Sequence, residues 1–348
     1  MVRGKRGVGE QGPHAAGLKD MPDRRDGLVY VMPQDLRLAV EVATATGRPL
    51  LLRGNPGSGK SSLAPYIARR RRWRYYEYVV TSQTRATDLL WTFDGVRRLA
   101  DAQAARFDGG GGGGGKAFDE DAYIEPGPLW WAFAPKSAAV VAEKTRHARR
   151  EHGSGDDAAS GPHKERWNRN RRVDHAVVLI DEIDKADPDV PNGLLVPLAS
   201  NGFTVTETGR RVAVEPAARP GAGGPFSRHL VIITTNEERE LPQAFLRRCV
   251  IASAPEPESC VELVDIAKAH LKARLNKVIA EDVTLAEALA DELLSVRREA
   301  ARDGIRPPST AEYLDALWAC RTLNIAVGDG RWEKLRGLTL VKPQQVRG

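Results

Sequence analysis

The stretch RPLLLRGNPGSGKSSLAPYIARR, residues 48–70, decides the fold of this chain. Its first part, Arg48–Arg53, is a short apolar run bounded by glycine and proline, which predicts a buried parallel strand. Lys60 to about Arg71 predicts a helix, and Arg74–Val80 (RYYEYVV) predicts a second strand. This order of strand, glycine-rich turn, helix and strand indicates a right-handed βαβ unit.

The glycine-rich turn of this unit, Gly54–Ser61, matches the pattern G-x-x-x-x-G-K-[ST] between a strand and a helix. Glycines let backbone amides surround phosphate groups, and the helix N-terminus adds partial positive charge. We expect Lys60 to reach the β- and γ-phosphates and the Ser61 hydroxyl to bind Mg²⁺. The alternative is a chance match, which the two flanking elements argue against. The predicted nucleotide-binding residues are Gly54, Asn55, Pro56, Gly57, Ser58, Gly59, Lys60, Ser61 and Ser62.

Two further apolar strands end in polar residues. Ala176–Asp181 (AVVLID) delivers Asp181 beside the phosphate site, where it is expected to hold Mg²⁺. The next residue, Glu182, is expected to polarise the attacking water as general base. Leu230–Asn236 (LVIITTN) ends in an amide that could orient this water or contact the γ-phosphate. The alternative is that Asn236 only caps the following turn.

A short amphipathic helix over Leu241–Arg248 ends in paired arginines. Arg247 and Arg248 could simply complement the dipole at the end of this helix. Their position after the other three motifs gives them a second interpretation.

This ordered set of motifs resembles the AAA+ ATPases over residues 28–342. In that family a P-loop, an Asp-Glu strand, a sensor-1 polar residue and an arginine finger occur in this order, and a helical lid domain follows. The resemblance implies Mg²⁺-dependent ATP hydrolysis, with Asn236 as the sensor. It also implies a finger that acts on the neighbouring subunit's γ-phosphate, with Arg248 as the finger and Arg247 as its alternative.

Within that family the sequence is most similar to the MoxR branch. TSQTRATDLLWTFD, residues 81–94, stands where that branch has its helix-2 insert, and YIEPGPLW, residues 123–130, resembles its "GPLF" stretch. LPQAFLRR, residues 241–248, resembles its "LPEAxLDRF" segment. The resemblance implies a homo-oligomeric ring, expected to be a hexamer, that remodels a protein client in a chaperone-like manner. It also implies a von Willebrand A-domain partner, and the insert-rich form resembles relatives in bacterial conflict systems.

The sequence departs from that branch in two places. About 40 residues separate the "GPLF"-like stretch from the Asp-Glu strand, which family members join almost directly. Thr310 occupies the position aligned with a sensor-2 arginine, and Arg306 could replace it only if its turn bends toward the nucleotide. Comparable segments in the family contact the adenine edge, which makes Val31 and Met32 candidates for that contact.

Three other groups have competing interpretations. The basic run Arg69–Arg72 is expected to be a solvated helix end. The aromatic groups Trp91/Phe93 and Trp130/Trp131/Phe133 could line a pore or grip a client peptide. The interpretation that we favour is that they anchor an insertion to the core.

The predicted fold class is α/β: a three-layer α/β/α P-loop NTPase sheet followed by an all-helical lid. The hairpin Phe203–Val214 and the strand Val250–Ser253 complete the first part, and helices are expected over about 258–278, 284–303 and 309–324. The expected domains are a flexible tail at 1–27, a nucleotide-binding domain at 28–255 and a lid at 256–348. Insertions are expected at about 81–128, with its flexible loop Gly109–Gly115, and at 136–175.

Composition restricts the function classes. The formal charge of the 348 residues is +6, and residues 1–27 and 136–175 carry all of this surplus. Because these segments look disordered or inserted, nucleic-acid binding is disfavoured. The chain has three cysteines without metal-like spacing, no apolar run long enough for a bilayer and no secretory signal, which favours a cytoplasmic protein.

Two other function classes stay open. One is an ATP-gated oligomeric switch or scaffold with little turnover, which the doubtful sensor 2 supports. The other is a DNA-acting AAA+ motor. It is less favoured because phosphate contacts need clustered lysines and arginines, whereas the residues outside 1–27 and 136–175 sum to zero charge.

Overall fold

The computed structural model describes residues 27–108, 118–151, 168–214 and 228–340. The chain divides into two compact units, of which one is Met32–Pro255 and the other combines Met1–Val31 with Glu256–Gly348. Three predicted segments lie outside the described residues: the tail up to residue 26, the glycine run 109–115 and the middle of the second insertion, 152–167.

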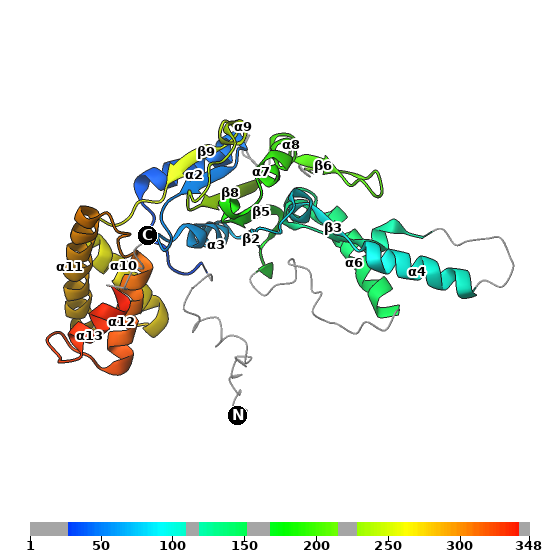
Figure 1. Ribbon diagram of the computed structural model, residues 1–348. Coiled ribbons are helices and arrows are strands. Elements are labelled where there is room, and N and C mark those ends of the chain that lie inside the picture. The colour runs from blue at the N-terminus through cyan, green and yellow to red at the C-terminus, as the bar shows by residue number, and fades with distance from the viewer. Residues whose placement is uncertain (1–26, 109–117, 152–167, 215–227, 341–348) are drawn as a thin grey trace, which may run out of the picture. The chain divides into compact units, whose positions relative to one another are not determined.

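Five parallel strands form the central sheet of the unit Met32–Pro255, in the order β2-β5-β8-β1-β9 (Figure 1). The predicted strands are confirmed, but β5 begins at Arg172, before the predicted start at Ala176. The reason is that its first residues run past β8 and pair with Trp73 of β2. The strands are β1 Leu50–Arg53, β2 Trp73–Val79, β5 Arg172–Asp181, β8 His229–Thr235 and β9 Val250–Ser253.

Helices cover both faces of this sheet, as the predicted three-layer fold requires. Alternate residues of a strand point to opposite faces, and Leu51, Val178 and Ile180 share one buried cluster with helix α5 (Pro128–Phe133). On the other face, α2 (Gln34–Thr46) contacts β1 and β9, and α3 (Lys60–Arg71) contacts β2 and β5. Both α2 and α3 have the bounds predicted from the sequence.

The region between β2 and β5, which the sequence predicted to be less regular, contains several short elements and two longer helices. Strands β3 and β4 pair antiparallel, and α6 packs on β4 through buried Ala138, Val141 and Thr145. Part of the second predicted insertion therefore belongs to the folded core. The elements are η1 Ala86–Leu89, β3 Trp91–Phe93, α4 Gly95–Asp108, η2 Glu120–Tyr123, β4 Ile124–Pro126, α5 and α6 Pro135–Glu151.

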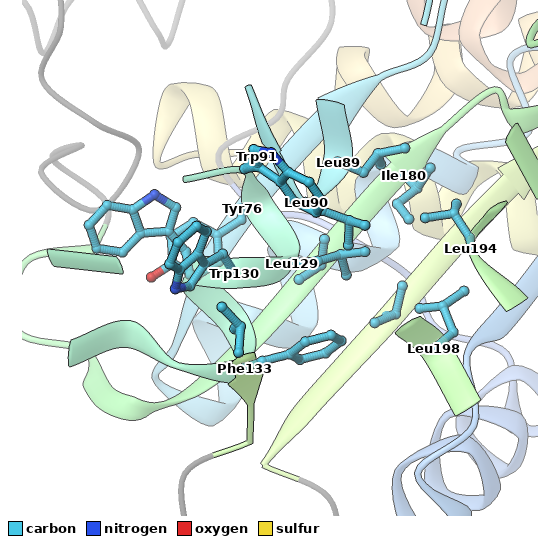
Figure 2. Close-up of a cluster of buried hydrophobic side chains, with 14 of the residues drawn as sticks. Tyr76, Leu89, Leu90, Trp91, Leu129, Trp130, Phe133, Ile180, Leu194 and Leu198 are labelled. Atoms are coloured by element: carbon cyan, nitrogen blue, oxygen red, sulfur yellow. The ribbon is translucent and has the colours of Figure 1, made fainter. Parts of the chain in front are cut away.

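The tryptophans of this region and Phe133 are buried, whereas Phe93 is half-buried. Trp130, Trp131 and Phe133 on α5 are at most 2% exposed, and Trp91 on β3 is 5% exposed. Figure 2 shows Trp91, Trp130 and Phe133 among leucines of the same cluster. These side chains therefore anchor the region to the sheet, and they are not available to line a pore or grip a client.

A hairpin of β6 (Gly202–Thr204) and β7 (Arg211–Ala213) is tied to the same aromatic residues. The Phe203 ring stacks on Trp91 with centroids 5.4 Å apart and meets the edge of Trp130 at 5.8 Å. The Trp91 indole also donates a hydrogen bond of 2.8 Å to Glu207 in the hairpin turn. The hairpin therefore packs against β3 and α5. Short helices connect β5 to this hairpin and precede β9: η5 Ile183–Lys185, α7 Asp189–Gly193, α8 Leu195–Ser200 and α9 Gln243–Leu246.

The C-terminal unit is helical, with three helices where the sequence predicted them and a fourth, α13, that it did not. Two of the helices begin with a reciprocal capping box, formed by Ser259 with Glu262 and by Ser309 with Glu312. The core contains Leu263, Leu289 and Tyr313, each at most 1% exposed. In the described part of the chain, no helix combines the length and apolar character that crossing a bilayer requires. The helices are α10 Cys260–Leu275, α11 Ala280–Asp303, α12 Thr310–Leu323 and α13 Trp332–Thr339.

The glycine of the "GPLF"-like stretch is held by close backbone packing. The Gly127 amide donates a 2.8 Å hydrogen bond to Leu90, and a Cβ at this position would lie 2.7 Å from backbone atoms of Leu89. We expect Gly127→Ala to lower the free energy of unfolding by about 1–3 kcal/mol, because backbone cannot move aside cheaply. Urea denaturation followed by tryptophan fluorescence measures this change.

The matched control is Gly95→Ala in the same region, where the added Cβ would meet the Phe93 ring at an ordinary 3.6 Å. Its unfolding midpoint should stay at the wild-type value. Equal midpoints for the two variants would contradict the close packing at Gly127.

Candidate functional site

The loop between β1 and α3 has a backbone shaped by its glycines. Gly57 and Gly59 have φ angles of 82° and 84°, in the left-handed region that other residues rarely adopt. The loop is closed by hydrogen bonds from the Ser58 amide (3.3 Å) and the Ser58 hydroxyl (2.8 Å) to the Asn55 carbonyl. Asn55, Pro56 and Gly57 are exposed at its tip. An exposed glycine-rich loop that leads into a helix N-terminus can accept an anionic group on its backbone amides.

Lys60, the first residue of α3, is only 6% exposed and its ammonium group lies inside the loop. Its Nζ donates to the carbonyls of Gly54 (2.6 Å) and Asn55 (2.8 Å) and to Asn236 Oδ1 (2.9 Å). Lys60 therefore joins the loop after β1 to the end of β8. Phosphate oxygens bound in the loop would have to replace part of these hydrogen bonds.

The carboxylate of Asp181 is buried, at 2% exposure. Its Oδ1 accepts hydrogen bonds from the Ser61 hydroxyl (2.7 Å) and the Thr234 hydroxyl (2.6 Å). Thr234 also accepts a 2.8 Å hydrogen bond from the Glu182 amide. Sequence reasoning missed Thr234, although it lies in the TTN end of β8, because its role depends on the pairing of β8 with β5.

Glu182 follows Asp181 in a left-handed conformation, with φ of 61°, at the start of η5. This turn brings its side chain toward Lys185, whose Nζ lies 2.6 Å from Oε2. The hydrogen bond from Lys185 to Glu182 raises the pKa of the lysine. The other oxygen, Oε1, accepts from Asn236 Nδ2 at 3.4 Å. Lys185 is a further site residue that the sequence motifs did not predict.

Asn236 is placed between the two halves of the site. Its side chain contacts both Lys60 and Glu182. Its backbone N–H donates a 3.0 Å hydrogen bond to the buried carboxylate of Asp184. Asp184 also accepts from the Glu238 amide at 3.0 Å. The carboxamide of Asn236 therefore faces the site, and Asp184 holds the chain segment that follows β8.

The donor set fits a magnesium ion bound together with nucleotide phosphates. The Ser61 and Asp181 oxygens are within hydrogen-bond distance of each other, and Mg²⁺ prefers oxygen ligands and commonly keeps phosphate and water in its shell. No cluster of three or more His, Cys, Asp or Glu able to hold a metal occurs among the described residues. A metal here would therefore depend on the nucleotide for part of its shell.

The other predicted residues lie on segments other than the β1–α3 loop and the ends of β5 and β8. Arg247 and Arg248 are exposed after α9, where Arg248 donates to the Ala244 carbonyl at 3.0 Å. Val31 is exposed and Met32 half-buried, and they fall into different units of the chain.

The two residues considered for sensor 2 lie in the C-terminal unit. Arg306 lies 3.8 Å from Glu312, the glutamate of the α12 capping box. Thr310 Oγ1 is buried and has no hydrogen-bond partner among the described residues.

The family comparison agrees with this geometry. Residues 49–249 match the family "AAA domain (dynein-related subfamily)". Similar solved structures include a protein assigned as an ATPase from Cytophaga hutchinsonii, with 14% identity, a TM-score of 0.36 and coverage of 87% of this chain and 79% of that one. The RuvB Holliday junction branch migration motor of Thermotoga maritima has 15% identity, a TM-score of 0.42 and coverage of 88% and 67%. NtrX from Brucella abortus has 13% identity, a TM-score of 0.43 and coverage of 87% and 53%.

No curated protein matches the sequence. The family match covers more than half of the chain and contains the loop, the Asp-Glu strand and the Asn236 strand described above. The chain belongs to the AAA domain family of the dynein-related subfamily, and it is an ATPase.

Proposed function

We propose that this ATPase is a MoxR-like ring that uses Mg²⁺-dependent ATP hydrolysis to remodel or activate a partner protein. The observation that carries the hydrolytic part is the linkage of Ser61, Asp181 and Thr234 through hydrogen bonds of 2.6–2.7 Å. This linkage supports the proposed role of Ser61 and Asp181 as metal ligands beside the phosphate loop. The remodelling part rests on the resemblance to the MoxR branch.

Binding of ATP would proceed by exchange of hydrogen bonds. The amides of the glycine-rich loop would take the phosphate oxygens, and Lys60 would turn from the carbonyls of Gly54 and Asn55 to the β- and γ-phosphates. Ser61 and Asp181 would hold Mg²⁺, which when bound neutralises charge on the phosphate oxygens.

In hydrolysis, Glu182 would act on the attacking water as general base. For this its Oε2 must leave Lys185, because the ion pair at 2.6 Å occupies the oxygen that would take the proton of the water. Asn236 would orient the same water, because its carboxamide already lies between Lys60 and Glu182.

Assembly would complete the site. Arg248, with Arg247 as the alternative, would reach the γ-phosphate of a neighbouring subunit, which supports a ring and, by resemblance, a hexamer. Both side chains are exposed, as a residue that acts on a neighbouring copy must be. The client is proposed to be a von Willebrand A-domain protein or one loaded by such a partner, and the location to be the cytoplasm.

An ATP-gated switch with little turnover is the second candidate function. The observation that favours it is the engagement of Glu182 by Lys185, together with threonine at the sensor-2 position and Arg306 beside Glu312. Intact oligomers with a turnover well below about one per minute would support the switch and exclude the remodelling motor.

The first prediction for the ATPase activity concerns the base and the finger. Glu182→Gln should lower ATP turnover about a hundredfold or more, and Arg248→Ala by about a thousandfold, because each removes a group that acts in the transition state. Steady-state phosphate release measures both. Arg302→Ala, at an exposed site in the C-terminal unit, is the control and should keep wild-type turnover.

Mixing the two inactive variants tests action between subunits. Glu182→Gln subunits still carry Arg248, so they can complete the sites of Arg248→Ala neighbours and restore part of the turnover. Wild-type turnover in both single variants would refute the mechanism. No recovery on mixing would refute a finger that acts between subunits.

The second prediction concerns Thr234. Thr234→Val keeps the side-chain volume but removes the hydroxyl that joins Asp181 to the Glu182 amide. ATP turnover should fall about tenfold or more, as expected for the loss of a hydrogen bond to a charged group. Thr235→Val is the matched control, since the Thr235 hydroxyl accepts only from the Glu237 amide among the described residues. Equal loss in both variants would contradict a special role of Thr234.

A further inference from the structure

Two arginine-rich segments that are far apart in the sequence lie together at one edge of the central sheet. Residues 69–72 (RRRR) end α3, and residues 169–172 (RNRR) lead into β5. The Arg172 amide donates to the Arg72 carbonyl at 2.9 Å, and the Arg171 guanidinium to the Trp73 carbonyl at 3.0 Å. We name the resulting surface the arginine edge: Arg69, Arg70, Arg71, Arg72, Arg169, Arg171 and Arg172.

Few acidic groups compensate this charge. Asp174 lies 3.7 Å from Arg172, and Glu41 acts electrostatically on Arg71. No acidic side chain of the described residues forms an ion pair with Arg69, Arg70, Arg72 or Arg169, and all four are exposed.

The two segments also repel each other. Burial lowers the pKa of the Arg171 guanidinium, and the positive charge of Arg69 lowers it further. Like charges held close together in the folded protein cost folding free energy. A ligand of opposite charge would recover this cost, so the clustering itself favours an anionic partner.

The arginine edge lies far from the ATPase site. It is formed where β2 and β5 begin, whereas Asp181 and Glu182 stand where β5 ends. The seven residues of β2 span about 20 Å at the usual rise of a strand. A partner bound at the arginine edge therefore does not need to touch the nucleotide.

We propose that the arginine edge binds the phosphate backbone of a nucleic acid. Guanidinium groups pair with phosphate oxygens through two parallel hydrogen bonds, and here all seven cations are arginines. The helix end 69–72 and the segment 169–172 meet at the hydrogen bond between the Arg172 amide and the Arg72 carbonyl, so their charge is concentrated on one small surface. Such a surface can bind phosphate groups of one backbone.

The same edge is unsuited to an added peptide strand. β2 is the outermost strand of the sheet, but the Asn168 side chain already accepts from the Tyr75 amide (2.7 Å) and donates to the Tyr75 carbonyl (2.9 Å). Asn168 is 4% exposed, so this cover is part of the fold. A peptide would find the main-chain groups of Tyr75 occupied.

The edge is also unsuited to a lipid surface. Within residues 69–74 and 168–175, Val173 is the single exposed apolar side chain, at 51%. Interfacial binding requires a broad apolar face beside the basic residues.

The test uses the full chain and short fluorescein-labelled single-stranded DNA, duplex DNA and single-stranded RNA in anisotropy titrations. Arg70→Glu/Arg169→Glu should weaken nucleic-acid binding about tenfold or more, and Arg70→Gln/Arg169→Gln should weaken it less. For single-stranded DNA, the slope of log affinity against log salt concentration should be shallower by about 1.4 in Arg70→Gln/Arg169→Gln than in the wild-type chain, because two phosphate contacts are lost.

The matched control is Arg298→Glu/Arg302→Glu, which changes the charge equally at exposed positions of α11. It should keep wild-type affinity. Basal ATP turnover should be unchanged in every variant, which shows that the variants are folded and separates this test from that of the proposed function.

Three results would overturn the proposal. The first is no nucleic-acid binding by the wild-type chain at low salt. The second is equal loss of affinity in the control pair. The third is tighter binding to poly-glutamate or to phosphatidylserine vesicles than to any of the three nucleic acids.

Discussion

The buried carboxylate of Asp181 is the interaction on which the rest of the site depends. At 2% exposure it is costly unless hydrogen-bonded, and Ser61 of α3 and Thr234 of β8 both donate to the same oxygen. These donors can meet only because β8 lies between β5 and β1 in the sheet. The strand order therefore fixes the distance between the phosphate loop and the Asp-Glu pair, and the hydroxyls hold it.

From this point the arrangement of the other residues follows. Thr234 holds the Glu182 amide, which stabilises the left-handed turn that directs the glutamate toward Lys185 and Asn236. Asn236 in turn contacts Lys60 in the loop, so every charged group of the site has a partner within the protein. Nucleotide must compete with these internal bonds, and each bond that it breaks releases a group for chemistry.

The sequence was sufficient for features that short segments encode. The phosphate loop, the apolar strands and the bounds of α2 and α3 could be predicted because strand, turn and helix signals are local. Thr234 and Lys185 could not be predicted, because their roles depend on strand pairing and on one unusual backbone angle. The sequence places α6 in an insertion, because nothing local reveals that Ala138 and Val141 are buried in the same cluster as the sheet residues Val178 and Ile180.

The same limit applies to the charge of the chain. Summed along the sequence, the surplus falls on residues 1–27 and 136–175, which suggested solvated appendages. The fold instead takes three arginines from the end of the second segment, at the start of β5, and sets them against the four that end α3. Electrostatic potential depends on distance in space, and a sum over segments removes that information. A chain whose remaining residues sum to neutrality can therefore carry a concentrated cationic surface. Here that surface lies where β2 and β5 begin, whereas Asp181 and Glu182 stand where β5 ends, so the two fields stay separate.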